Sequence, residues 1–107
     1  MDIQIKKGLL EVCVLAVLHR EDSYGYKIIG DLSGLIEISE STLYPILKRL
    51  EAAQCLTTYS REHNSRLRKY YQITQEGRKR IDAFLAEWDE VMRIYHFILE
   101  GEQQSHE

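Results

Sequence analysis

The most regular feature of the sequence is a seven-residue apolar repeat near its C-terminal end. The repeat lasts for almost three heptads, and acidic residues lie outside its apolar stripe. Such a repeat is typical of a long helix that packs against a second helix. We therefore expect a helix over residues 75–100 that stops at Gly101, and a flexible tail over 101–107. The predicted dimerisation residues are Ile81, Leu85, Trp88, Met92, Tyr95 and Leu99.

The length of the chain also favours association. A chain of 107 residues forms one domain and buries only about two thirds of its unfolded surface, so a second chain sharing the core would stabilise it. The apolar content of 44% and the charged content of 29% are those of a soluble globular protein. No segment has the length of a membrane span or the order of a signal peptide. We expect a cytoplasmic protein in which Cys13 and Cys55 are buried, reduced thiols.

The net charge of −3 conceals a strong asymmetry along the chain. Residues 1–40 hold four basic residues against seven acidic ones, and residues 81–107 hold one against seven. Residues 41–80 hold nine basic residues against three acidic ones. A basic middle between acidic ends indicates one surface that meets an anion.

Apolar periodicity predicts three helices in the first half of the chain. Residues 7–19 are apolar on nearly all sides, which predicts a helix buried by its own domain and also by a partner chain. Residues 24–32 form a second short helix, with Ser23 as its N-cap. The third helix follows Ser39, and Pro45 should kink or loosen its first turns. Its buried face consists of Leu43, Ile46, Leu47 and Leu50.

Two runs typical of strands follow, at residues 56–60 and 68–74, joined by a polar loop over 61–67. Tyr70 and Tyr71 point to opposite faces of the second strand, so one of them packs against the core. The other tyrosine either places its hydroxyl on a phosphate or is an ordinary strand aromatic.

The order helix, helix, helix, hairpin, helix predicts a mainly α protein with a small β-hairpin. We expect a winged helix-turn-helix over residues 1–74, followed by a C-terminal dimerisation helix that Thr74 caps. In such proteins the third helix enters the major groove of DNA and the hairpin is the wing. The hairpin loop offers hydrogen-bond donors from Arg61, Arg66 and Arg68 with Asn64 and Ser65. The basic residues therefore belong to one face suited to a polyanion.

The motifs at these positions resemble a known family. The third helix reads TLYPILKRLE at 42–51, the second strand and the next helix start read RKYYQITQEG at 68–77, and the second helix contains GYKI at 25–28. With KGLLEVCVLAVL as the first helix, the chain resembles the PadR-like family of bacterial transcriptional regulators. The resemblance implies a homodimer that binds a palindromic operator in double-stranded DNA and represses transcription. It also implies the shorter subgroup, which ends in a single dimerisation helix.

The resemblance assigns a set of DNA-facing residues. These are Tyr24, Ser41, Thr42, Tyr44, Lys48, Asn64, Arg66 and Lys69. Gln54 replaces the glycine that usually ends the third helix, so it either accepts strain or ends the helix differently. Ser65 and Leu67 replace a glycine and a proline before the wing strand, so we expect different contacts at the wing tip. Residues 78–80 (Arg-Lys-Arg) either meet an external anion or form a solvated charge run.

Trp88 has two interpretations. Shorter members of the family bind flat, hydrophobic, often cationic compounds at the dimer interface through a tryptophan on this helix. The resemblance makes Trp88 and Met92 candidates for binding a small planar hydrophobic effector. Alternatively, Trp88 packs the core of the dimer.

The sequence does not indicate an enzyme. Its four histidines and two cysteines lack the spacing of metal ligands, and it contains no glycine-rich phosphate loop or nucleophile motif. We expect no cofactor, no metal and no membrane partner. The leading hypothesis is a homodimeric DNA-binding transcriptional regulator, a repressor released by a small hydrophobic or aromatic effector. The alternative is a winged-helix protein–protein interaction module, which the basic middle of the chain argues against.

Overall fold

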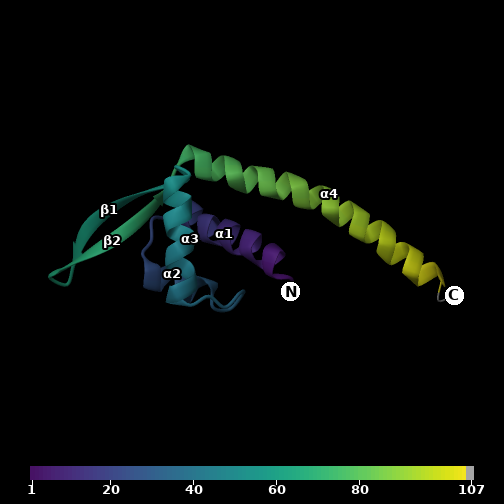
Figure 1. The fold of residues 1–107 in the computed structure, drawn as a ribbon, viewed down its shortest axis with the longest axis horizontal. Helices are drawn as coiled ribbons and strands as arrows, with labels where there is room; N and C mark the ends of the chain where they lie inside the picture. Colours follow the sequence, from purple (N-terminus) through teal and green to yellow (C-terminus); the bar gives the residue numbers. More distant parts are fainter. Residues whose placement is uncertain (106–107) are drawn as a thin grey trace.

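The computed structural model describes residues 1–105, and the chain forms four helices and one hairpin in the order that the sequence predicts. Figure 1 shows α1, α2, α3 and the hairpin together at one end, with α4 leading away from them. This order confirms the winged helix-turn-helix with a C-terminal helix. The elements are α1 (Ile3–Arg20), α2 (Gly25–Leu32), α3 (Glu40–Ala52), β1 (Leu56–His63), β2 (Arg66–Ile73) and α4 (Gln75–Ser105).

The core forms where the first three helices meet the base of the hairpin. Val14 and Leu15 of α1 and Ile28 of α2 are completely buried there. The predicted apolar face of α3 is confirmed, because Leu43, Ile46, Leu47 and Leu50 are all buried. The outward side of α1 is different: Ile5 and Ala16 are exposed within the chain. The domain itself therefore covers only part of this apolar helix.

The two cysteines are free, as predicted, but only one of them is fully buried. Cys55 lies in the core, whereas Cys13 of α1 is half-buried and packs against it. Partial burial raises the pKa of the Cys13 thiol.

The hairpin is longer than the sequence suggested. β1 and β2 pair antiparallel along eight residues each, and His63 pairs with Arg66 across a two-residue turn. The prediction of a loop over residues 61–67 is therefore wrong. Asn64 and Ser65 form the turn with φ angles of 52° and 65°, which is the left-handed geometry of a tight hairpin turn. Only Asn64 is a residue type that favours such geometry, so the turn signal is weak in the sequence.

Some helix ends agree with the sequence and others differ. Thr74 caps α4 as predicted: the Gly77 N–H donates to Thr74 Oγ1 at 3.1 Å. Gln54 follows α3 with a φ of 62°, so of the two alternatives expected from the sequence it takes the one in which it accepts backbone strain. Ser23 is not the N-cap of α2; Tyr24 takes that place, while the Ser23 backbone pairs with Tyr71 of β2. That pairing is a tertiary contact, which local sequence does not reveal.

The end of α4 was also predicted wrongly. The helix continues through Gly101 to Ser105, because a glycine inside a helix lowers its stability without breaking it. Positions 106 and 107 of the expected tail lie outside the described residues. The C-terminal half of α4 stands clear of the other elements, and the molecule measures 66 × 26 × 21 Å (Figure 1). Within residues 1–105, no helix has the length and apolarity needed to cross a membrane.

Candidate nucleic-acid interface

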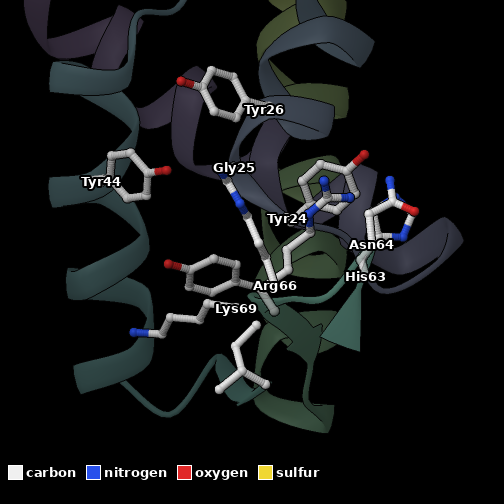
Figure 2. Close-up of a pocket in the computed structure, with 11 residues that line it drawn as sticks. Tyr24, Gly25, Tyr26, Tyr44, His63, Asn64, Arg66 and Lys69 are labelled. Carbon is white, nitrogen blue, oxygen red and sulfur yellow. The ribbon is translucent and has the colours of Figure 1, made fainter. Parts of the chain in front are cut away.

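A cleft of about 550 Å³ lies between the start of α2, the middle of α3 and the tip of the hairpin. In Figure 2, Tyr44 and Lys69 border it on one side, and Tyr24 and Asn64 border it on the other. Arg66 also lines the cleft. These residues come from three separate segments of the chain. The structure thus brings together five of the eight side chains that the family resemblance assigned to DNA.

Lys48 lies just outside this cleft. It lines a smaller hollow of about 220 Å³ between α3 and β2, which it shares with Tyr44 and Lys69. Glu51 is the acidic residue of this hollow, and it accepts a hydrogen bond from the Thr58 hydroxyl at 3.2 Å. The two lysines therefore extend the basic surface from the wing along α3.

Ser41 and Thr42 occupy the exposed first turn of α3, outside the main cleft. Their hydroxyl oxygens lie 3.0 and 3.1 Å from Ser39 Oγ. Ser39 is the N-cap of α3 as predicted, but its side chain bonds to these hydroxyls and not to the helix backbone. Three hydroxyl groups are thus gathered at the N-terminal end of α3, where the helix dipole favours negative charge.

Several cleft residues were missing from the predicted set. They are Gly25, Tyr26, His63, Leu67, Arg68 and Tyr71. Tyr26 is 72% exposed, and its hydrogen bond with Glu40 raises the pKa of the tyrosine. Tyr26 lies on another side of α2 from Tyr24, so helical periodicity gave no reason to group them. Arg68 was recognised as a donor, but nothing in the sequence placed it in the cleft.

A glycine allows the cleft to form where α2 meets α3. A Cβ atom on Gly25 would lie 2.5 Å from the hydroxyl oxygen of Tyr44, a distance that real Cβ contacts do not reach. A side chain at position 25 would therefore displace the Tyr44 hydroxyl. Gly25 lets the Tyr44 side chain lie against the first turn of α2.

The charges divide into two groups when their partners are compared. Among residues 1–105, five basic side chains of the wing and the neighbouring face of α3 make no ion pair: Lys48, Arg61, Arg66, Arg68 and Lys69. By contrast, Arg80 and Arg49 both pair with Glu11, at 3.7 and 3.3 Å, and Lys79 pairs with Glu76 at 3.3 Å. Two of the three residues at positions 78–80 are therefore occupied by acids of the same chain. Lys6, Lys7, Arg20 and Arg78 also make no ion pair among residues 1–105, but they lie on α1 and α4 and do not line the cleft.

The apolar stripe of α4 is largely uncovered within the chain. Leu85 is 59% exposed and Tyr95 is 50% exposed, and Met92 and Leu99 are exposed as well. Ile81 packs against the core. Trp88 is half-buried beside Phe84, with ring centroids 5.8 Å apart. The stripe thus begins on the domain and continues onto a free helix.

The described part of the chain contains no group of three or more His, Cys, Asp or Glu side chains that is arranged to hold a metal ion. Its distinctive chemistry is the cationic, tyrosine-lined cleft beside a helix-turn-helix and a wing. These features define a winged helix-turn-helix protein.

Comparison with known families identifies the chain more closely. It belongs to the transcriptional regulator PadR-like family, whose model matches residues 14–83. This confirms the resemblance seen in the sequence. The family consists of transcriptional regulators, which confirms that the chain is not an enzyme.

Solved structures agree with this assignment. The chain is 43% identical to smu.1704 from Streptococcus mutans UA159, with a TM-score of 0.79, over 89% of this chain and 90% of that one. It is 33% identical to a PadR family transcriptional regulator from Eggerthella lenta DSM 2243, with a TM-score of 0.80, over 92% of this chain and 88% of that one. Bacillus subtilis PadR in complex with operator DNA is 22% identical, with a TM-score of 0.66, over 71% of this chain and 46% of that one. The last comparison shows a shared fold alone.

Proposed function

We propose that the chain is a homodimeric, DNA-binding transcriptional repressor. The observation that carries this proposal is the set of cations without acidic partners at the cleft and wing. Free arginine and lysine side chains on one face are what a polyanion requires. The family is one of transcriptional regulators, and a B. subtilis member with the same fold has been solved with operator DNA.

The proposed binding mode follows from the positions of the elements. The exposed side of α3, with Ser41, Thr42, Tyr44 and Lys48, enters the major groove. The wing carries Asn64, Arg66 and Lys69 to the neighbouring backbone and minor groove, and Tyr24 meets a phosphate from α2. Two copies then occupy successive half-sites of a palindrome.

The apolar surfaces that the chain leaves uncovered support the homodimer. The stripe of α4 exposes several large side chains, and α1 exposes Ile5 and Ala16 on its outward side. Uncovered apolar side chains of this kind are typical of an interface between chains. Pairing of α4 with the α4 helix of a second copy, through Ile81, Leu85, Trp88, Met92, Tyr95 and Leu99, would cover those on α4.

The finer part of the proposal concerns an effector. We propose that a small planar hydrophobic compound binds at the dimer interface beside Trp88 and Met92 and releases the repressor from DNA. It would do so by favouring a dimer whose recognition helices no longer match the half-site spacing. Since Trp88 is the single tryptophan, its fluorescence reports on this site alone. Planar cationic dyes should quench the emission at micromolar concentration; unchanged emission across a panel of dyes would contradict the effector site and leave DNA binding untouched.

DNA binding is tested by selecting duplexes from a randomised pool with the purified full-length protein. We expect an enriched palindrome. Lys48→Ala and Arg66→Ala should each bind it more weakly, and the slope of log affinity against log salt should fall by about one per lost phosphate contact. Lys79→Ala is the matched control, because Lys79 is already paired with Glu76 and lies outside the cleft. If nothing is enriched, a protein-binding module becomes the better interpretation. If both variants bind the palindrome like the unaltered protein, DNA binding stands and the assignment of Lys48 and Arg66 as contacts is wrong.

A further inference from the structure

Three tyrosines from different segments form a continuous stack beside the wing. The rings of Tyr59 in β1 and Tyr70 in β2 are nearly parallel, with centroids 5.5 Å apart and planes 9° apart. Tyr24, at the start of α2, meets the Tyr70 ring edge-on at a centroid distance of 5.5 Å. We call Tyr24, Tyr70 and Tyr59 the tyrosine stack. It joins both strands of the wing to the helix-turn-helix.

Each end of the tyrosine stack is held by a charged group. The Arg68 guanidinium lies over the Tyr24 ring, 3.9 Å from its centroid. At the other end, the Tyr59 hydroxyl donates a hydrogen bond of 2.6 Å to Asp22 Oδ2. Asp22 belongs to the segment between α1 and α2, so this bond ties β1 directly to the helical body.

The tyrosine stack also resolves an electrostatic conflict in the hairpin. Arg61 and Arg68 face each other directly across the two strands, an arrangement of like charges that destabilises a sheet. Arg61 lies 5.7 Å from the centroid of the Tyr70 ring, while Arg68 lies over Tyr24. The negative faces of the two rings attract the guanidinium groups and offset their mutual repulsion. The wing can therefore carry both arginines without an acidic partner.

The position of the tyrosine stack along the hairpin determines how far the wing is anchored to the helices. The base of β2 is anchored by two backbone hydrogen bonds between Ser23 and Tyr71, of 2.8 and 3.2 Å. Beyond that point a two-stranded hairpin has little rigidity of its own. The stack extends the anchored region outward to Arg68, which is two residues from Arg66 at the tip.

We infer that the tyrosine stack, locked by the Tyr59–Asp22 hydrogen bond, fixes the angle between the wing and α3, so that Tyr59 and Asp22 are positioning residues for DNA recognition. This inference rests on the proposed DNA binding. Neither residue lines the cleft, so each acts through the wing. A wing at a fixed angle reads the DNA at a fixed distance from α3, and loss of the lock should weaken binding without removing a phosphate contact.

The test uses the full-length protein and two independent readouts. Hydrogen exchange of the wing amides, without DNA, measures how often the wing opens. Titration with the selected operator at several salt concentrations measures affinity and salt slope. The variants are Tyr59→Phe, Asp22→Ala and the double variant. Thr57→Val is the matched control, since it removes an exposed hydroxyl from the same face of β1 that has no hydrogen bond among the residues described.

We expect Tyr59→Phe to speed wing exchange and to weaken operator binding, each roughly three- to tenfold, with an unchanged salt slope. The double variant should match either single variant in wing exchange, because both remove the same bond. The inference is overturned if Tyr59→Phe exchanges like Thr57→Val, or if exchange rises while operator affinity stays the same. Failure of the proposed function would give a different result. If the unaltered protein selects no duplex, the proposal of DNA binding is wrong, whatever the hydrogen exchange shows.

Discussion

Gly77 gives the sharpest test of how α4 is attached to the domain. It lies in the first turn of α4 and is buried. A Cβ atom at this position would collide with the backbone carbonyl oxygen of Cys55 and would lie 2.7 Å from Cγ1 of Ile73. Neither obstacle is the free end of a flexible side chain. Gly77→Ala therefore forces the start of α4 away from the segment between α3 and β1 and from the end of β2.

Two effects of opposite sign decide the magnitude. Alanine is the better helix former, and in an unobstructed helix the exchange would stabilise the protein by about 0.5–1 kcal/mol. Overpacking of a tight contact costs about 1–3 kcal/mol, and more when backbone must move. We expect the cost of overpacking to exceed the gain in helix propensity, with a net loss of about 1–2 kcal/mol in the free energy of unfolding. For a domain of this size that corresponds to roughly 4–16 °C in Tm.

Gly8→Ala is the matched control, because a Cβ atom on Gly8 of α1 would have no neighbour within 4 Å. This variant should gain stability where Gly77→Ala loses it. Urea and thermal unfolding followed by circular dichroism, at one fixed protein concentration, measure both. Concentration must be held constant because the proposed association of two copies would contribute to the apparent stability. If Gly77→Ala were as stable as the unaltered protein, the tight joint between α3 and α4 would be refuted.

Three further predictions concern backbone strain and ionisation. Gln54→Gly and Ser65→Gly each place glycine at a positive φ, so each should raise the free energy of unfolding by about 0.5–1 kcal/mol in urea titrations; no gain would mean that the strain is absent. Burial raises the pKa of Tyr71, and the hydrogen bond to Asp22 raises the pKa of Tyr59. The contribution of these neutral tyrosines to the free energy of unfolding should therefore be fully present below pH 10 and be lost as the pH rises above it. A flat pH profile between 9 and 11 would contradict this. Cys13, whose pKa is raised by burial, should react with Ellman's reagent at pH 8 more slowly than a cysteine peptide.

The parts of the fold that the sequence predicted are those set by local periodicity. The buried face of α3 followed from residues spaced by three and four, and the opposed directions of Tyr70 and Tyr71 followed from strand alternation. Tyr71 is the buried one, pairing with Ser23, while Tyr70 belongs to the tyrosine stack. The Thr74 cap followed from its place before the last helix. Each of these rests on neighbours in sequence, which a reader of the sequence can see.

The features that were missed depend on contacts between distant segments. The predicted strands were too short because residues 61–67 are polar. Pairing across the hairpin, which the sequence does not show, extends both strands into this region. Ser23 resembles a helix cap, but its backbone is engaged by β2. Arg68 resembles a free phosphate donor, yet the Tyr24 ring lies beneath its guanidinium. In the site, residue types predicted the chemistry, whereas the geometry came from tertiary packing.

The joint between α3 and α4 explains how an event on α4 reaches the DNA-facing helix in the proposed mechanism. The Thr74 hydroxyl donates to the Gln54 carbonyl at 2.7 Å, which fixes the start of α4 to the end of α3. Glu11 of α1 then holds Arg49 of α3 with one carboxylate oxygen and Arg80 of α4 with the other. Because this joint fixes α4 to α3, a change in the angle between two α4 helices in the proposed dimer would rotate each α3 with it. The proposed effector would therefore need no contact with the cleft, since altered packing around α4 in the proposed dimer would change the spacing of the two recognition helices.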